Sequence, residues 1–160
     1  MAGASIKVSV RGERPIAKAL NRLLKRGQNL TPVLGDIGEY LLPSTQQRFV
    51  DMQAPDGSPW AELSGTTVEM KAAKGARLDR ILTDSGTLAD TLHYQISSDT
   101  LSLGSNQEYA AIQQLGGITA PNSMIPGVEI PAREFLGMAP FEKNEVEAMV
   151  AGYLAQAIGS

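Results

Sequence analysis

Apolar residues change their spacing along this chain, and the change predicts a mixed fold. Ile6, Val8 and Val10 alternate with polar residues, which is the period of a strand with one buried face. From Val146 to Ile158, apolar residues instead recur every three or four positions, as they do along one face of a helix. A chain with both periods buries its apolar residues by packing helices on a sheet. The sequence therefore predicts the α+β class.

Two more segments have helical spacing. Residues 15–26 begin with a proline and are followed by Gly27, in the places where helices favour these residues. A further helix is expected to begin at Thr31 as its N-cap residue, with Pro32 in the first turn. Pro43 is expected to kink or interrupt this helix, because proline lacks the backbone donor and clashes with the preceding turn. Residues 46–52 are expected to continue as helix beyond it.

Strand alternation returns between residues 92 and 104. The apolar residues of two short runs, with turn-forming residues between the runs, are Leu92, Tyr94, Ile96, Leu101 and Leu103. This spacing predicts a β-hairpin at about 92–104. Together with the N-terminal strand, the hairpin gives a small antiparallel sheet packed against several helices.

Glycine and proline cluster between these periodic segments, with 16 Gly and 9 Pro in the chain. A short helix is expected to end at Gly116, and the excursion over 118–131 is either an exposed loop or a further hairpin arm. A chain of 160 residues suits a single hydrophobic core. We therefore expect one domain over residues 1–160, with extended loops at about 53–80 and 117–133.

Charge and cysteine content exclude several classes of function. The net charge of -3 argues against specific nucleic-acid binding, which depends on clustered Lys and Arg. The stretch from Lys71 to Arg80 is locally basic and could face DNA or an acidic partner, although a solvated loop is the favoured interpretation. The absence of Cys excludes disulfides and thiolate metal sites. We expect no membrane span and no signal peptide, since the apolar runs are too short for either.

Groups that carry catalysis are sparse. His93 is the single histidine, so the chain has one imidazole base and no His/Cys set for a metal. Ser85 and Ser105 lack the Gly-x-Ser-x-Gly context of a serine nucleophile. We therefore expect a protein that is not an enzyme and that holds no cofactor or metal.

Five short segments stand in an order that is hard to obtain by chance. They are QAPDGSPW (53–60), ILTDSGTL (81–88), LGSN (103–106), YAAIQQLGG (109–117) and IPAREFLG (130–137). In this order the segments resemble the phage virion morphogenesis or tail completion family of Mu-like and related phages. Two positions depart from the family pattern, which often has His where this chain has Gln113 and has Pro where it has Glu134.

The resemblance implies a structural virion protein at the head-tail neck or the tail terminus. It implies a ring, with a hexamer favoured, that completes the tail or joins it to the capsid while DNA passes through. The implied partners are copies of the chain and other neck, connector and tail-tube proteins, assembled in the host cytoplasm and kept in the virion. The alternatives are an assembly chaperone that leaves before maturation and, remotely, a small morphogenesis hydrolase. Copy number in purified particles separates a virion component from a chaperone.

Contacts between subunits are expected within the family motifs. The residues predicted to make them are Trp60, Tyr109, Arg133, Phe135 and Leu136. Trp60 follows a stiff turn and is a residue type that dominates many interfaces, but folding back onto its own core is the favoured alternative. For residues 109–117, plain helix packing is favoured over a wall of the ring. Arg133 suits a bidentate contact with a neighbour's carboxylate, and an internal salt bridge is an equal alternative.

Overall fold

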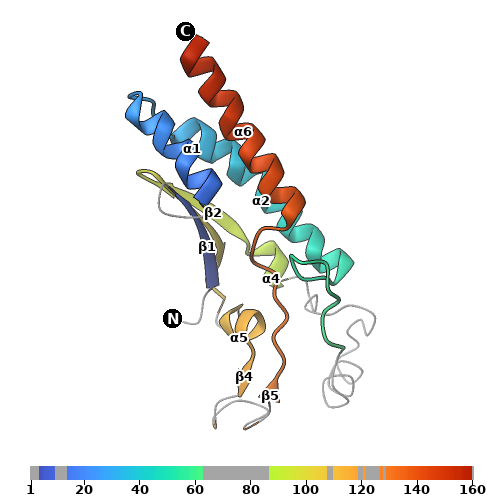
Figure 1. The fold of residues 1–160 in the computed structure, drawn as a ribbon. Coiled ribbons are helices and arrows are strands. Elements are labelled where there is room, and N and C mark those ends of the chain that lie inside the picture. Colours follow the sequence, from blue (N-terminus) through green and yellow to red (C-terminus); the bar gives the residue numbers. More distant parts are fainter. Residues whose placement is uncertain are drawn as a thin grey trace. The chain divides into compact units, whose positions relative to one another are not determined.

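The computed structural model describes residues 4–9, 14–62, 87–107, 110–118, 121, 127 and 129–159. Within these ranges the chain forms helices and two small sheets, which confirms the predicted α+β class (Figure 1). The chain forms two compact units, which are described separately. The sheet unit contains the described parts of 5–44, 93–104 and 138–160, and the loop unit contains those of 1–4, 45–92 and 105–137. The prediction of one domain over residues 1–160 stays a prediction.

The sheet unit contains a three-stranded sheet in the order β1-β3-β2. Its strands are β1 (Ala4–Ser9), β2 (His93–Ser97) and β3 (Thr100–Ser105). Strands β2 and β3 are antiparallel, with Ile96 opposite Leu101. The hairpin predicted from strand alternation is therefore confirmed.

Three helices contribute to the core of the sheet unit: α1 (Arg14–Lys25), the first part of α2 (Thr31–Asp51) and α6 (Pro140–Gly159). They lie on one face of the sheet, and α1 packs against α6 (Figure 1). Their apolar stripes meet the inward-facing strand residues in a single cluster of buried side chains. Its members are Val8, Ile16, Leu20, Leu23, Leu30, Val33, Leu34, Ile37, Leu41, Leu101, Leu103, Val146 and Val150.

The start of α2 differs from its prediction. The carbonyl oxygen of Leu30 accepts the first helical hydrogen bond, from Leu34 N at 2.9 Å, so Leu30 occupies the N-cap position in place of Thr31. The backbone N–H of Thr31 donates to Asn29 Oδ1 at 3.1 Å. Asn29 supplies the capping oxygen from one residue before the cap, and the hydroxyl of Thr31 is not needed for this bond.

Pro43 does not interrupt α2, which continues through it to Asp51. The Pro43 side chain is exposed, so its ring lies on the solvent side of the helix. Of the two expectations for Pro43, the interruption is wrong and the kink stays a prediction. The expected continuation of helix over residues 46–52 is confirmed as far as Asp51.

The loop unit contains shorter elements, which are α4 (Thr87–Asp90), α5 (Ala110–Leu115), β4 (Gly117–Ile118) and β5 (Glu129–Ile130). Strands β4 and β5 pair antiparallel, with Gly117 opposite Ile130 and Ile118 opposite Glu129. For the excursion over 118–131, the described residues therefore match the hairpin-arm alternative. The basic stretch Lys71 to Arg80 lies outside the described residues.

Candidate interaction site

The loop after α2 is a compact turn closed by its own backbone. Ala54 N donates to Ser58 O at 2.8 Å, and Gly57 N donates to Ala54 O at 2.9 Å. Asp56 Oδ1 accepts from both the hydroxyl of Ser58 at 2.6 Å and its backbone N–H at 2.9 Å. The hydroxyl hydrogen bond of Ser58, followed by its backbone hydrogen bond, lowers the pKa of Asp56 below its usual value. The turn fixes the direction in which the chain enters Trp60.

Trp60 is 5% exposed and belongs to the interior of the loop unit. Its indole N–H donates to Glu134 O at 2.7 Å. Its ring meets Phe49 edge-on, with centroids 5.4 Å apart, and Phe49 lies 5.5 Å from Phe135. Edge-on and tilted aromatic pairs of this kind are favourable beyond the area that they bury. The three rings join the end of α2, the turn and the segment after β5.

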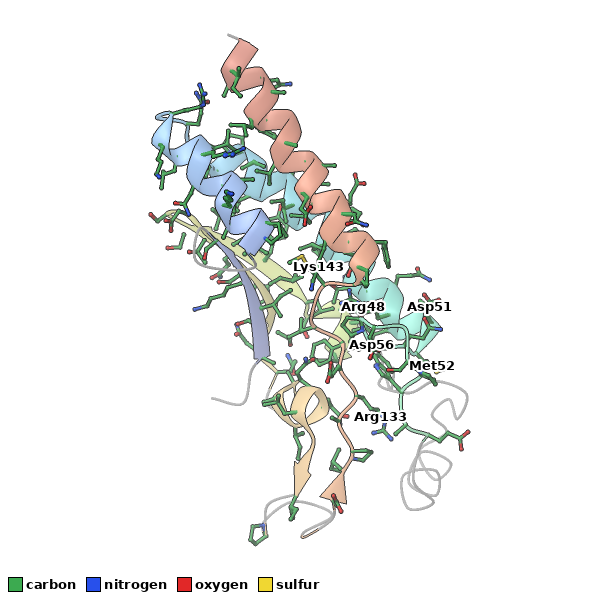
Figure 2. All side chains as sticks on the ribbon, viewed as in Figure 1. Arg48, Asp51, Met52, Asp56, Arg133 and Lys143 are labelled. Carbon is green, nitrogen blue, oxygen red and sulfur yellow. The ribbon has the colours of Figure 1, made fainter. Side chains whose placement is uncertain are left out.

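Residues 131–137, which follow β5 and are called the strap below, are held by buried hydrogen bonds. The side chain of Arg133 is 7% exposed, and its guanidinium donates to Ala61 O and Glu62 O, each at 2.8 Å. Figure 2 shows Arg133 projecting from the strap toward the loop that follows α2. Desolvation by burial lowers the pKa of Arg133 from its usual value. Its backbone N–H also donates to Gln113 O at 2.6 Å, which ties the strap to α5.

Gln114 and Arg48 hold the same strap, and sequence analysis did not single out either residue. Gln114 Oε1 accepts from Phe135 N and Leu136 N at 3.0 Å each, and its Nε2 donates to Leu136 O at 3.1 Å. Arg48 is 7% exposed and donates to Phe135 O at 2.7 Å. Helical spacing was the available signal for Arg48, since it stands two turns after Leu41, on the apolar side of the helix.

Two glycines permit close approaches at this junction. Gly116 has φ of +73°, and a Cβ there would lie 2.9 Å from Ala132 N and from Ile130 O. Gly137 has φ of +143°, and a Cβ there would lie 2.9 Å from Pro55 Cγ. Positive φ and the lack of space both favour glycine at these positions. The glycines in the family motifs therefore allow the turn, α5 and the strap to meet.

Four of the five residues predicted to contact neighbouring subunits are described, and all four lie in the loop unit. Trp60, Arg133, Phe135 and Leu136 are all buried in the loop unit, where they connect the family motifs. Tyr109 lies outside the described residues. A role for these five positions at a subunit interface stays a prediction. Within this chain, the four described residues connect the turn after α2 to the strap and the end of α2.

Of the residues considered for catalysis, His93 and Ser105 are described, and the hydroxyl of Ser105 makes hydrogen bonds within the loop unit. His93 lies on strand β2 and is half-buried, and Ser85 lies outside the described residues. Ser105 Oγ lies 2.9 Å from the hydroxyl of Thr91 and accepts from Gln107 N at 3.1 Å. In the part of the chain that the structure describes, no group of three or more His, Asp or Glu side chains could hold a metal ion.

The chain matches a family of known proteins over most of its length. The family model described as the phage virion morphogenesis family matches residues 12–155. The chain belongs to this family. The phage virion morphogenesis family thus covers both the sheet unit and the loop unit, which confirms the resemblance found in the sequence.

A relative in Escherichia phage Mu is named "Putative capsid assembly protein G". It is 32% identical to this chain over 107 residues, which is 66% of this chain and 67% of the relative. No solved structure gives a significant match.

Membership of the phage virion morphogenesis family assigns the chain a role in phage virion assembly, as a virion-associated protein. The names of the family and the relative describe structural or morphogenesis roles and suggest a protein that is not an enzyme. Among the helices in the described ranges, none has the length and apolar character needed to cross a membrane.

Proposed function

We propose that this chain is the subunit of a structural ring at the head-tail neck or the tail terminus. In this role it completes the tail or joins it to the capsid. Membership of the phage virion morphogenesis family supports a role in assembly, and the ring and its position are the step beyond it. The observation that carries the proposal is the set of hydrogen bonds by which the turn, α5 and the strap hold one another.

These hydrogen bonds join α2 and the motifs into a scaffold. Arg48, Trp60 and Arg133 each donate to backbone carbonyl oxygens of the loop unit. Loops held in this way have already lost conformational freedom, so they lose less entropy when a partner binds. A rigid loop region suits a protein whose work is association, with interface burial as the source of free energy.

The proposed partners are copies of the chain, in a ring for which six copies are favoured, and other neck, connector and tail-tube proteins. The net charge of -3 per copy suits a ring through which DNA passes, since an acidic surface repels phosphates and does not retain them. Assembly in the host cytoplasm is part of the same proposal.

The proposal is tested in purified particles. A phage that lacks this gene would be complemented with the tagged chain, its particles would be counted by quantitative mass spectrometry, and the neck would be imaged by electron cryomicroscopy. We expect a fixed, small copy number at one end of the tail. Absence from finished particles would support the chaperone alternative and overturn the ring. A variant with His93→Gln should give unchanged particle yield, while a loss of yield with a folded variant would reopen the hydrolase alternative.

A further inference from the structure

Charged residues are unevenly distributed along the sequence. The two longest stretches without Asp, Glu, Lys, Arg or His lie between Glu108 and Glu129 and after Glu147. The described part of the first stretch includes α5 and β4 in the loop unit, and the second forms the later turns of α6 in the sheet unit. Since 19% of the chain's residues are charged, surfaces built from these two stretches stand out by having no charged side chains of their own.

The first surface is the corner between α5 and β4, which we call the apolar corner and define by Leu115 and Ile118. Their side chains are 76% and 71% exposed, the largest fractions among the exposed large apolar residues of the described ranges. The corner is rigid, because Gly116 N donates to Ile112 O at 2.7 Å and Arg133 N donates to Gln113 O at 2.6 Å. Exposed apolar side chains on a rigid support indicate an interaction surface.

The second surface is a pocket in the sheet unit, where the connection between α1 and α2 meets the later turns of α6. We call it the α6 pocket, and it has a volume of about 350 Å³. Its lining residues are apolar or uncharged polar: Leu23, Gln28, Asn29, Pro32, Val33, Tyr153, Gln156 and Ala157. The hydroxyl of Tyr153 donates to Asp36 Oδ2, which holds this wall of the pocket in place.

A ring needs two different surfaces on each copy, because head-to-tail contacts join one patch to another around the circle. We propose, on the basis of the ring function above, that the apolar corner of one copy binds in the α6 pocket of the next copy. The chemistry of the two surfaces matches, since Leu115 and Ile118 meet a lining without charged residues. The volume of the pocket is of the scale that holds a few side chains.

A second copy fits these surfaces better than a charged foreign partner. Each copy has a net charge of -3, so copies repel one another where their acidic faces approach. Leu115, Ile118 and the lining residues of the pocket carry no charge, so their contact buries apolar area without like charges at its centre, while Glu129 lies beside Ile118 at its edge.

The inference is tested first by single substitutions in the purified full chain, with association measured by native mass spectrometry and sedimentation. Leu115→Glu and Ile118→Lys place charges on exposed positions of the corner, and Gln156→Glu places one at the exposed rim of the pocket. We expect each to weaken association by about tenfold or more, because each introduces an unpaired charge into a contact between uncharged groups. Lys at position 118 faces Glu129 across the arm and so adds no like-charge pair. Phe141→Glu is the control, because Phe141 is 64% exposed but adjoins Glu142 and Lys143 on α6.

Mixing two variants tests the pairing itself. Leu115→Glu chains keep an intact pocket, and Gln156→Glu chains keep an intact corner. At a concentration just sufficient for the wild-type chain to associate, each variant alone should be mostly monomeric, while an equal mixture should form two-chain complexes that do not grow. Like-with-like contacts between two corners or between two pockets would give no such mixed complex and would overturn the inference.

The outcomes separate this inference from the ring proposal. If the wild-type chain associates and the corner and pocket variants associate equally well, the pairing is wrong and the ring stands. If the wild-type chain stays monomeric at all concentrations, the pairing is also wrong, and copy number in purified particles then decides the ring independently. Circular dichroism of each variant shows whether it is folded.

Discussion

Gln114 and Leu136 form a reciprocal pair of hydrogen bonds. Leu136 N donates to Gln114 Oε1 at 3.0 Å, and Gln114 Nε2 donates to Leu136 O at 3.1 Å. A side-chain amide thus supplies the donor and the acceptor that a neighbouring strand would supply to the strap. Since the same Oε1 also accepts from Phe135 N, a single residue of α5 satisfies three backbone groups.

Gln114→Met is expected to destabilise the chain by about 2 kcal/mol, because it leaves these part-buried backbone groups without partners while keeping side-chain volume. Chemical denaturation with circular dichroism measures the free energy of unfolding. Gln47→Met is the matched control, since Gln47 is exposed and donates to Asp51 one turn later in α2. Equal stability of the two variants would contradict the structural role of Gln114.

The close approach at Gly116 gives a second prediction. Gly116→Ala puts a Cβ 2.9 Å from two backbone atoms at a φ of +73°, whereas Gly27→Ala meets nothing within 4 Å at a φ of +77°. The control should lose about 1 kcal/mol from its left-handed conformation alone. Gly116→Ala should lose about 3 kcal/mol or more, because backbone atoms must also shift. Thermal unfolding of both variants measures the difference, and similar melting temperatures would contradict the close approach.

The sequence predicted most of the regular structure because periodic patterns are local. Strand β1, the β2–β3 hairpin and helices α1 and α6 each bury a face whose spacing is visible without the rest of the chain. The end of α5 at Gly116 follows from the same local rules. The N-cap of α2 was misplaced, because Thr31 is a favoured capping residue, whereas in the folded chain Leu30 takes the N-cap position and Asn29 supplies the capping oxygen.

The arrangement of the candidate site could not be predicted in this way. Arg48 donates to a carbonyl 87 positions away, and Arg133 to carbonyls 71 and 72 positions away. A carbonyl oxygen is present in every residue, so the sequence has no signal for which one a buried guanidinium meets. Trp60 and Arg133 were selected as residues that contact a neighbouring subunit, which stays a prediction, and the hydrogen bonds that they make within the chain depend on tertiary structure.

Adjacent hydroxyls in α2 give a third prediction with an internal control. Ser44 Oγ donates to the fully buried Glu142 at 2.5 Å, whereas Thr45 Oγ1 is buried and has no hydrogen-bond partner among the described residues. Ser44→Ala should destabilise the chain by about 2 kcal/mol, because the carboxylate loses a donor. Thr45→Val should be neutral or stabilise it by about 1 kcal/mol, because an unpaired buried hydroxyl is removed at equal volume. Chemical denaturation measures both, and a large loss from Thr45→Val would contradict this account.

The hydroxyl of Tyr153 gives a prediction about alkaline pH. Its hydrogen bond to Asp36, followed by desolvation, raises the pKa of Tyr153 above the usual 10.0. The folded chain therefore holds this proton more tightly than the unfolded chain, so the contribution to stability is complete below pH 10 and is lost as pH rises through the folded pKa. The stability difference between the wild-type chain and Tyr153→Phe should thus shrink at alkaline pH. Denaturation at a series of pH values measures it.

Asp36→Asn is the control for this effect, because it removes the negative charge while keeping an oxygen that can accept the hydrogen bond. The pKa of Tyr153 should then move back toward 10.0, as followed by the absorbance of the tyrosinate form. Tyr94 also titrates with a raised pKa, from desolvation and then its hydrogen bond to Glu39, so the titration is read in a Tyr94→Phe background. A Tyr153 pKa that is unchanged by Asp36→Asn would mean that the carboxylate of Asp36 does not hold the hydroxyl proton, and the wall of the α6 pocket would then lack this support.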